Sequence, residues 1–120
     1  MVDFVPRLDI DMVQGSDFIT EITVNDSGSP RDFTNWSAEM DIRTAVRASA
    51  TAAELSTTNG RITFNSPATD GKINLFLPNT VTATLNQRRY KHDLELTDPS
   101  GIKSKLFRGN VNVTFEVTRA

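Results

Sequence analysis

The sequence contains no cysteine. Its absence excludes a disulfide framework, a thiolate metal site and a cysteine nucleophile. At 120 residues the chain fits one domain and is long enough to bury a core without such cross-links. We expect a single domain over residues 8–120, preceded by an N-terminal arm or edge segment over residues 1–7.

Long apolar runs and an excess of basic charge are also missing. No stretch approaches the roughly 18 apolar residues of a membrane span, and the N-terminus has no apolar region typical of a signal peptide. Thirteen basic and fifteen acidic residues give a formal net charge of −2, whereas nucleic-acid binders usually carry a basic excess. The basic run over residues 88–92 is typical of a solvated strand face. We therefore expect neither a membrane nor a nucleic acid as partner, and synthesis in a cytoplasm.

Groups that perform catalysis are equally scarce. The single histidine, His92, has no serine in a Gly-x-Ser-x-Gly elbow to activate, and the six glycines are scattered rather than gathered in a phosphate loop. Asp9 and Asp11 alternate on one strand, about 7 Å apart if extended, but a calcium site needs six or more converging oxygens. The sequence predicts no catalytic residue, no cofactor and no metal site.

What the sequence does contain is short runs in which apolar and polar residues alternate, which is typical of half-buried strands. Turn residues separate the runs, notably 25–30, 59–60, 66–71 and 98–101. The apolar members of the runs are Leu8, Ile10 and Met12; Phe18, Ile22 and Val24; Trp36, Ala38, Met40 and Ile42; Ile62 and Phe64; Ile73, Leu75 and Leu77; Tyr90, Leu94 and Leu96; and Leu106, Val111, Val113, Phe115 and Val117.

A few positions depart from this alternation. Ile19 is out of phase in its run, Phe76 falls on the opposite face of its own, and Gly109 shifts the phase of the last, which indicates a bulge or bend. Residues 44–56 are rich in alanine and predict either a short helix or a loop with a poor edge strand. Residues 79–86 predict a short helical crossover that begins with Asn79 or Thr80 as N-cap.

Seven or eight short strands without a long helix predict an all-β sandwich or barrel. The crossover with Leu85, followed by Tyr90 at the start of a strand, resembles the corner that links the two sheets of immunoglobulin-like domains. We therefore predict an immunoglobulin-like antiparallel β-sandwich. Without a disulfide, burial of apolar area at about 25 cal/mol per Å² must hold its sheets together.

Five segments, taken in order, resemble a family of small tailed-bacteriophage structural proteins with an immunoglobulin-like fold. The resemblance spans about residues 8–118, and its order and spacing are more specific than any one motif. The segments are Gln14-Gly15-Ser16-Asp17-Phe18, Trp36-Ser37-Ala38-Glu39-Met40-Asp41-Ile42-Arg43, Asn59-Gly60-Arg61-Ile62, Tyr90-Lys91-His92-Asp93-Leu94-Glu95-Leu96-Thr97 and Leu106-Phe107-Arg108-Gly109-Asn110-Val111.

This resemblance implies a non-enzymatic structural subunit of a virion, placed in the tail, baseplate or neck. Its partners would be other virion structural proteins, or copies of itself in a symmetric assembly. The apolar residues Val2, Phe4 and Val5 are candidates for partner binding through the N-terminal arm, and strand edges offer further contacts. The alternatives are a capsid-surface decoration protein and a carbohydrate-binding β-sandwich, and the latter requires an outward-facing Trp36.

Overall fold

The computed structural model describes residues 6–118 and is built mainly of strands, which confirms an all-β chain. The longer strands follow the alternating runs of the sequence, because side chains of successive residues point to opposite faces. The elements are β1 (Ile10–Val13), β2 (Phe18–Thr23), β3 (Asn25–Asp26), β4 (Ser29–Pro30), β5 (Ser37–Arg43), β6 (Ala53–Ser56), β7 (Ile62–Phe64), the 3₁₀ turn η1 (Ala68–Asp70), β8 (Lys72–Leu77), α1 (Asn79–Thr82), β9 (Arg89–Thr97) and β10 (Lys103–Thr114).

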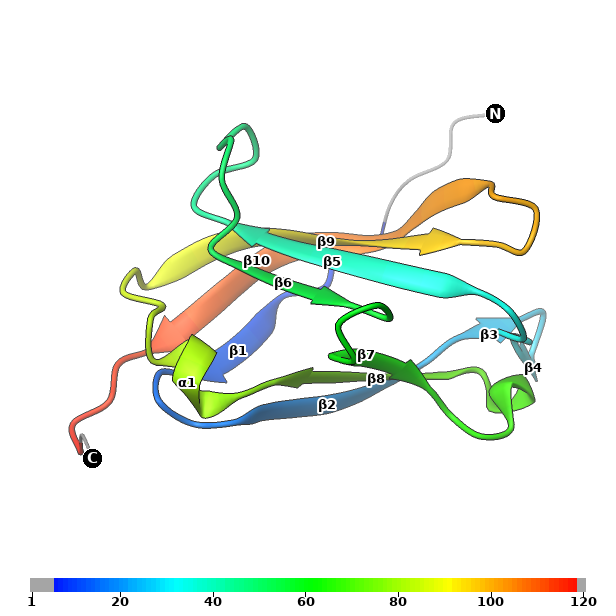
Figure 1. The fold of residues 1–120 in the computed structure, drawn as a ribbon, viewed down its shortest axis with the longest axis horizontal. Helices are drawn as coiled ribbons and strands as arrows, with labels where there is room; N and C mark the ends of the chain where they lie inside the picture. The colour runs from blue at the N-terminus through cyan, green and yellow to red at the C-terminus, as the bar shows by residue number, and fades with distance from the viewer. Residues whose placement is uncertain (1–5, 119–120) are drawn as a thin grey trace.

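Two sheets face each other across the core (Figure 1). The larger has the order β1-β10-β9-β5-β6 and the smaller has the order β2-β8-β7, while β3 and β4 form a separate two-stranded ribbon. Each described sheet is open and ends in edge strands, so the ladder does not close as it would in a barrel. All pairings are antiparallel except that of β1 with β10, which is parallel. The predicted antiparallel pairing therefore holds for the other strands but not for β1.

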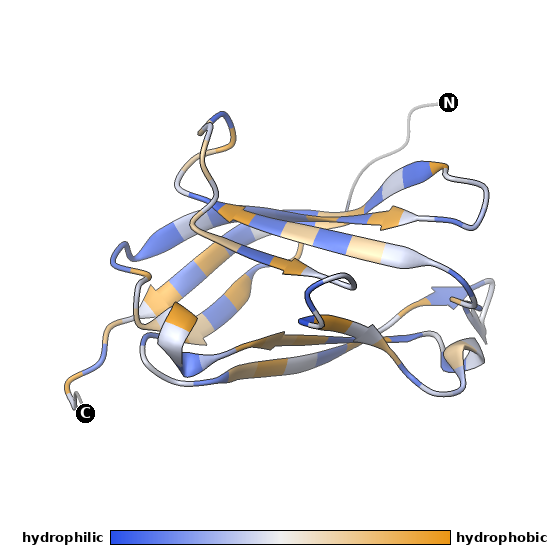
Figure 2. Ribbon diagram, viewed as in Figure 1, coloured by the Kyte–Doolittle hydropathy of each residue, from blue (hydrophilic) through white to orange (hydrophobic). Residues whose placement is uncertain are grey.

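Alternation along the strands supplies the core. Figure 2 shows hydrophobic and hydrophilic residues following one another along β5 and β9. The inward residues of β9 are all buried, as predicted, and include His92 as well as the apolar ones. The largest fully buried side chains are Phe33, Met12, Met40, Ile42, Leu55, Ile62, Ile73, Leu75, Leu77, Leu85, Leu94 and Leu96.

Residues 44–56 take the second of the two predicted forms. A loop over residues 44–52 rises from the larger sheet on the side away from the smaller one, and a short edge strand, β6, follows (Figure 1). The alternation resumes only in β6, where Ala53 and Leu55 are buried and Glu54 is exposed. In β6 one side of the strand is buried and the other is exposed, whereas the preceding alanines form no buried face.

The predicted crossover is present but shorter, because helix α1 ends at Thr82. The N-cap position is Pro78, not Asn79 or Thr80, and no side chain of the helix caps its own end. Instead the carboxylate of Asp17, from the turn before β2, accepts hydrogen bonds from the backbone N–H (2.6 Å) and the side-chain amide (2.9 Å) of Asn79. A cap supplied from 62 residues away is not visible in the local sequence.

Tyr90 follows this crossover and is buried at the start of β9. Its hydroxyl accepts a hydrogen bond from the backbone N–H of Gln87 (3.1 Å). The ring therefore packs in the core while the hydroxyl fixes the chain that enters β9 from α1.

The last strand differs from its predicted phase. The register shifts between Lys105 and Phe107, so the irregularity lies at Leu106 and not at Gly109. Phe107 consequently takes the buried position that the sequence assigned to Leu106. Phe115 and Val117 follow the end of β10 and are exposed, so the predicted inward phase does not extend to them.

Candidate interaction surfaces

The predicted partner-binding residues Val2, Phe4 and Val5 lie outside the described residues. The chain that follows them is held on β10. The carbonyl oxygen of Pro6 accepts a hydrogen bond from the N–H of Arg108 (3.0 Å), and Leu8 donates to the carbonyl oxygen of Arg108 (2.8 Å). Any arm formed by residues 1–5 would therefore start from the β1–β10 edge of the larger sheet.

Leu8 was expected in the core but is 37% exposed, and β1 starts only at Ile10. The reason lies in a close approach between this segment and Gly109. A Cβ atom at position 109 would overlap the carbonyl oxygen of Leu8 and would lie 2.8 Å from the Asp9 carboxylate. Asp9 also accepts a hydrogen bond from the N–H of Asn110 (2.9 Å), which lowers the pKa of this carboxyl. Gly109 is thus a point of backbone contact, not the predicted bulge.

His92 is buried in the middle of β9 and serves this same contact. Its Nε2 lies 2.7 Å from the carbonyl oxygen of Leu8, and since a carbonyl only accepts, this nitrogen carries the proton. Its Nδ1 is buried and has no hydrogen-bond partner among residues 6–118. Burial lowers the pKa of His92, against smaller raising effects of the Leu8 carbonyl and nearby Asp93 and Asp9. A catalytic histidine of the serine-hydrolase type would instead have its second nitrogen oriented by a carboxylate.

The outer face of the larger sheet is densely charged. Register places Asp41 opposite Asp93 and Glu39 opposite Glu95, which are repulsive like-charge pairs. Lys105 compensates by approaching Asp93 (3.5 Å) and Glu95 (3.0 Å). The hydrogen bond from Lys105 is the main cause of the lowered pKa of Glu95.

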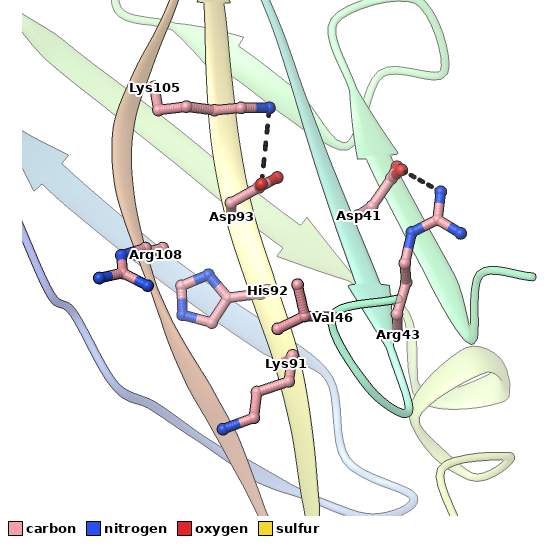
Figure 3. Close-up of a pocket in the computed structure, with 8 residues that line it drawn as sticks. All are labelled: Asp41, Arg43, Val46, Lys91, His92, Asp93, Lys105 and Arg108. Carbon is pink, nitrogen blue, oxygen red and sulfur yellow. Dashed lines mark hydrogen bonds and ion pairs between the residues drawn. The ribbon is translucent and has the colours of Figure 1, made fainter. Parts of the chain in front are cut away.

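A shallow hollow of about 320 Å³ lies on this face (Figure 3). Its floor comes from β5, β9 and β10, and Val46 reaches it from the loop over residues 44–52. The remaining lining residues are Asp41, Arg43, Lys91, His92, Asp93, Lys105 and Arg108. Most of these charges already have partners within the chain: Arg43 pairs with Asp41 (2.9 Å), and Lys91 donates to the Asn110 side chain (2.6 Å). The lining nevertheless holds four basic side chains against two carboxylates, so the hollow keeps an excess of positive charge.

Three carboxylates at the β6 side of this face offer oxygens within 4.8 Å of one another, namely those of Glu39, Asp41 and Glu54. Only one oxygen of each group converges, which is three against the six or more that calcium takes, and Arg43 already pairs with Asp41. Asp9 and Asp11, the pair considered from sequence, are instead engaged with Asn110 and Asn112.

Trp36 does not meet the condition set for a carbohydrate-binding site. Its side chain is partly buried against the core and meets Phe33 edge-on, with ring centroids 5.6 Å apart. The guanidinium of Arg31 lies 5.7 Å from the ring centroid. Trp36 therefore acts as a packing residue at the edge of the core.

An apolar pair on the outer face of the smaller sheet was not predicted as a site. Ile19 of β2 is 74% exposed and pairs directly with Phe76 of β8, which is 40% exposed. The sequence did contain the signal, because both residues break the alternation of their runs. Register then brings the two exceptions side by side on the same outer face.

β2 is also an edge strand of the smaller sheet, and backbone hydrogen bonds near it show which of its N–H and C=O groups face away from β8. The N–H of Val24 donates to the carbonyl oxygen of Gly71, which directly precedes β8. Because backbone groups alternate in direction along a strand, the N–H and C=O groups of Ile22 and Thr20 also point toward β8. Phe76 donates away from β2, to Arg61, which agrees with this phase. The N–H and C=O groups of Ile19, Glu21 and Thr23 therefore point outward, and no hydrogen bond engages them among the described residues.

No known family model matches the chain, and no curated protein is detectably similar to it. Within residues 6–118, no helix has the length and apolar character needed to cross a membrane. The assignment of function therefore starts from the surfaces described above.

Proposed function

We propose that the chain is an immunoglobulin-like β-sandwich. In that fold one sheet contains strands B, E and D and the other contains C, F and G. Sequence order here gives β2, β8 and β7 in one sheet and β5, β9 and β10 in the other, which fits the same arrangement. Tyr90 occupies the corner between β8 and β9 and bonds the backbone just upstream, as the corner tyrosine of such domains does.

We further propose that this domain is a non-enzymatic structural subunit of a tailed-phage virion, in the tail, baseplate or neck. The observation that carries a protein-binding role is the free edge of β2 beside the exposed Ile19–Phe76 pair. An edge strand with unpaired backbone groups and apolar side chains is a ready template for another chain. The sequence resemblance supplies the virion as the setting.

The charged groups of the chain support a binding role over a catalytic one. The buried Nδ1 of His92 meets no carboxylate or hydroxyl among residues 6–118, and the carboxylates Asp93 and Glu95 are engaged by Lys105. These groups are arranged to hold strands together.

Deletion of the coding region from the phage or prophage that carries it tests the proposal. We expect particles that lack the chain to be incomplete or non-infectious by electron microscopy and plaque assay, with rescue by the chain supplied in trans. Complete, infectious particles without the chain would contradict a role as an essential structural subunit.

A further inference from the structure

We propose that β2 is a self-association edge, on which a second copy of this chain adds its own β2 antiparallel about a two-fold axis at Thr20. The proposal deepens the proposed structural role by naming the partner and the contact. It follows from three features of β2: its free backbone groups, its exposed apolar pair and the position of its one charge.

The backbone provides the first feature. Ile19, Glu21 and Thr23 direct their N–H and C=O groups to solvent. In an antiparallel pair, residues that exchange both hydrogen bonds alternate with residues that exchange none. With Thr20 on the axis, Ile19 of each copy exchanges hydrogen bonds with Glu21 of the other, and the Thr20 residues form the non-bonded pair between them.

Charge selects this register. An axis at Glu21 uses as many residues of β2 but places the two Glu21 carboxylates directly opposite each other, which is destabilising. With the axis at Thr20, each Glu21 faces Ile19 of the other copy, while Lys72 of its own copy lies 3.5 Å from its carboxylate.

The apolar pair supplies the third feature. A two-fold contact is made from the same patch on both subunits, so the patch must complement itself. In the Thr20 register the Ile19 side chains of the two copies lie diagonally across the joined strands, within reach of each other. Each is flanked by Phe76 of its own copy, so four exposed apolar side chains form one stripe on a six-stranded sheet.

A proline scan of the edges tests the contact by sedimentation velocity over protein concentrations up to about 1 mM. Glu21→Pro removes an N–H that is unused within the chain, and edge positions of this kind tolerate proline. Glu54→Pro is the matched control: Leu55 and Ala53 face β5, so the N–H of Glu54 points away from the sheet and is likewise unused among the described residues. On that side only the Glu54 carbonyl oxygen is engaged, by the side chains of Asn59 and Arg61. We expect weak dimers, because one short edge buries less area than stable interfaces do. Glu21→Pro should weaken dimerisation at least tenfold, and Glu54→Pro should leave it unchanged.

Cysteine cross-linking gives a second readout, made simple by the absence of native cysteine. Thr20→Cys should form a disulfide dimer on mild oxidation, since non-bonded antiparallel pairs place their Cα atoms about 4.5 Å apart, within disulfide range. Thr23→Cys should not, because the Thr20 register separates the two copies of residue 23 by about 20 Å.

A chain that stays monomeric over the whole range, a dimer that survives Glu21→Pro, or a Thr23→Cys variant that cross-links as readily as Thr20→Cys would overturn the contact. None of these results would contradict the structural-subunit role if the deletion experiment shows that particles require the chain. Conversely, particles that form normally without the chain would remove that role and leave the dimer measurement intact.

Discussion

At the scale of single residues, the best-defined contact joins the centre of the larger sheet to the segment before β1. His92 donates to the carbonyl of Leu8, and Gly109 leaves the space in which that carbonyl lies. Both residues contact the same short stretch of backbone at Leu8. Two predictions concern this contact.

The first prediction concerns pH. Burial lowers the pKa of His92 in the folded chain below its ordinary value of about 6.5, so below that pH the unfolded chain binds a proton that the folded chain does not. The free energy of unfolding should therefore decrease as the pH falls from about 6.5, until the folded-state pKa is passed. His92→Gln retains a side-chain N–H for Leu8 but cannot titrate, and should lose this dependence. Urea titrations between pH 7.5 and 5 measure it, and equal slopes for both proteins would refute the assignment.

The second prediction concerns Gly109. Gly109→Ala places a methyl group against the Leu8 carbonyl, and this carbonyl cannot swing away without loss of its hydrogen bond from His92. We expect a loss of about 1–3 kcal/mol in the free energy of unfolding, the usual range for overpacking. Gly101→Ala is an informative comparison, since its loss would come from its positive φ alone, with no atom in the way. Wild-type stability for Gly109→Ala would mean that the segment before β1 is loosely held.

At the scale of elements, the short helix α1 depends on a residue outside it. Asp17 receives both the backbone N–H and the side-chain amide of Asn79, so the turn before β2 caps the helix that follows β8. The buried Thr82 adds a second link, because its hydroxyl donates to the carbonyl oxygen of Ser16 (2.8 Å). The crossover is thus fastened to the start of β2 at both of its ends.

Removal of the cap should be measurable. Asp17→Ala should cost about 1 kcal/mol, the typical value for loss of a capping side chain. Asp11→Ala is the control, because its carboxylate makes one longer, exposed contact to Asn112 (3.3 Å). Chemical denaturation of both variants gives the comparison, and an Asp17→Ala protein as stable as Asp11→Ala would show that the cap contributes nothing.

The elements also show what local sequence can and cannot predict. Strict alternation, as in β5 and β9, defines a strand because one phase must be buried. The predictions failed where a distant segment sets the geometry, as at Leu8 beside Gly109 and at the Asp17 cap. The shift at Leu106 belongs to the same class, since only pairing with β9 decides whether Leu106 or Phe107 faces inward.

At the scale of the whole molecule, the candidate surfaces were harder to predict than the fold. Ile19 and Phe76 were recognisable as exceptions, but their contact exists only through the β2–β8 register. The predicted arm residues Val2, Phe4 and Val5 lie outside the described residues and stay a prediction.

The proposed role as a structural subunit is tested most directly by quantitative mass spectrometry of gradient-purified particles from the encoding phage. A virion subunit is present in fixed proportion to the other structural proteins, so we expect peptides of this chain at a constant ratio to theirs across the particle peak. Absence of the chain from the peak, or a ratio that falls with each purification step as for a host contaminant, would contradict the role.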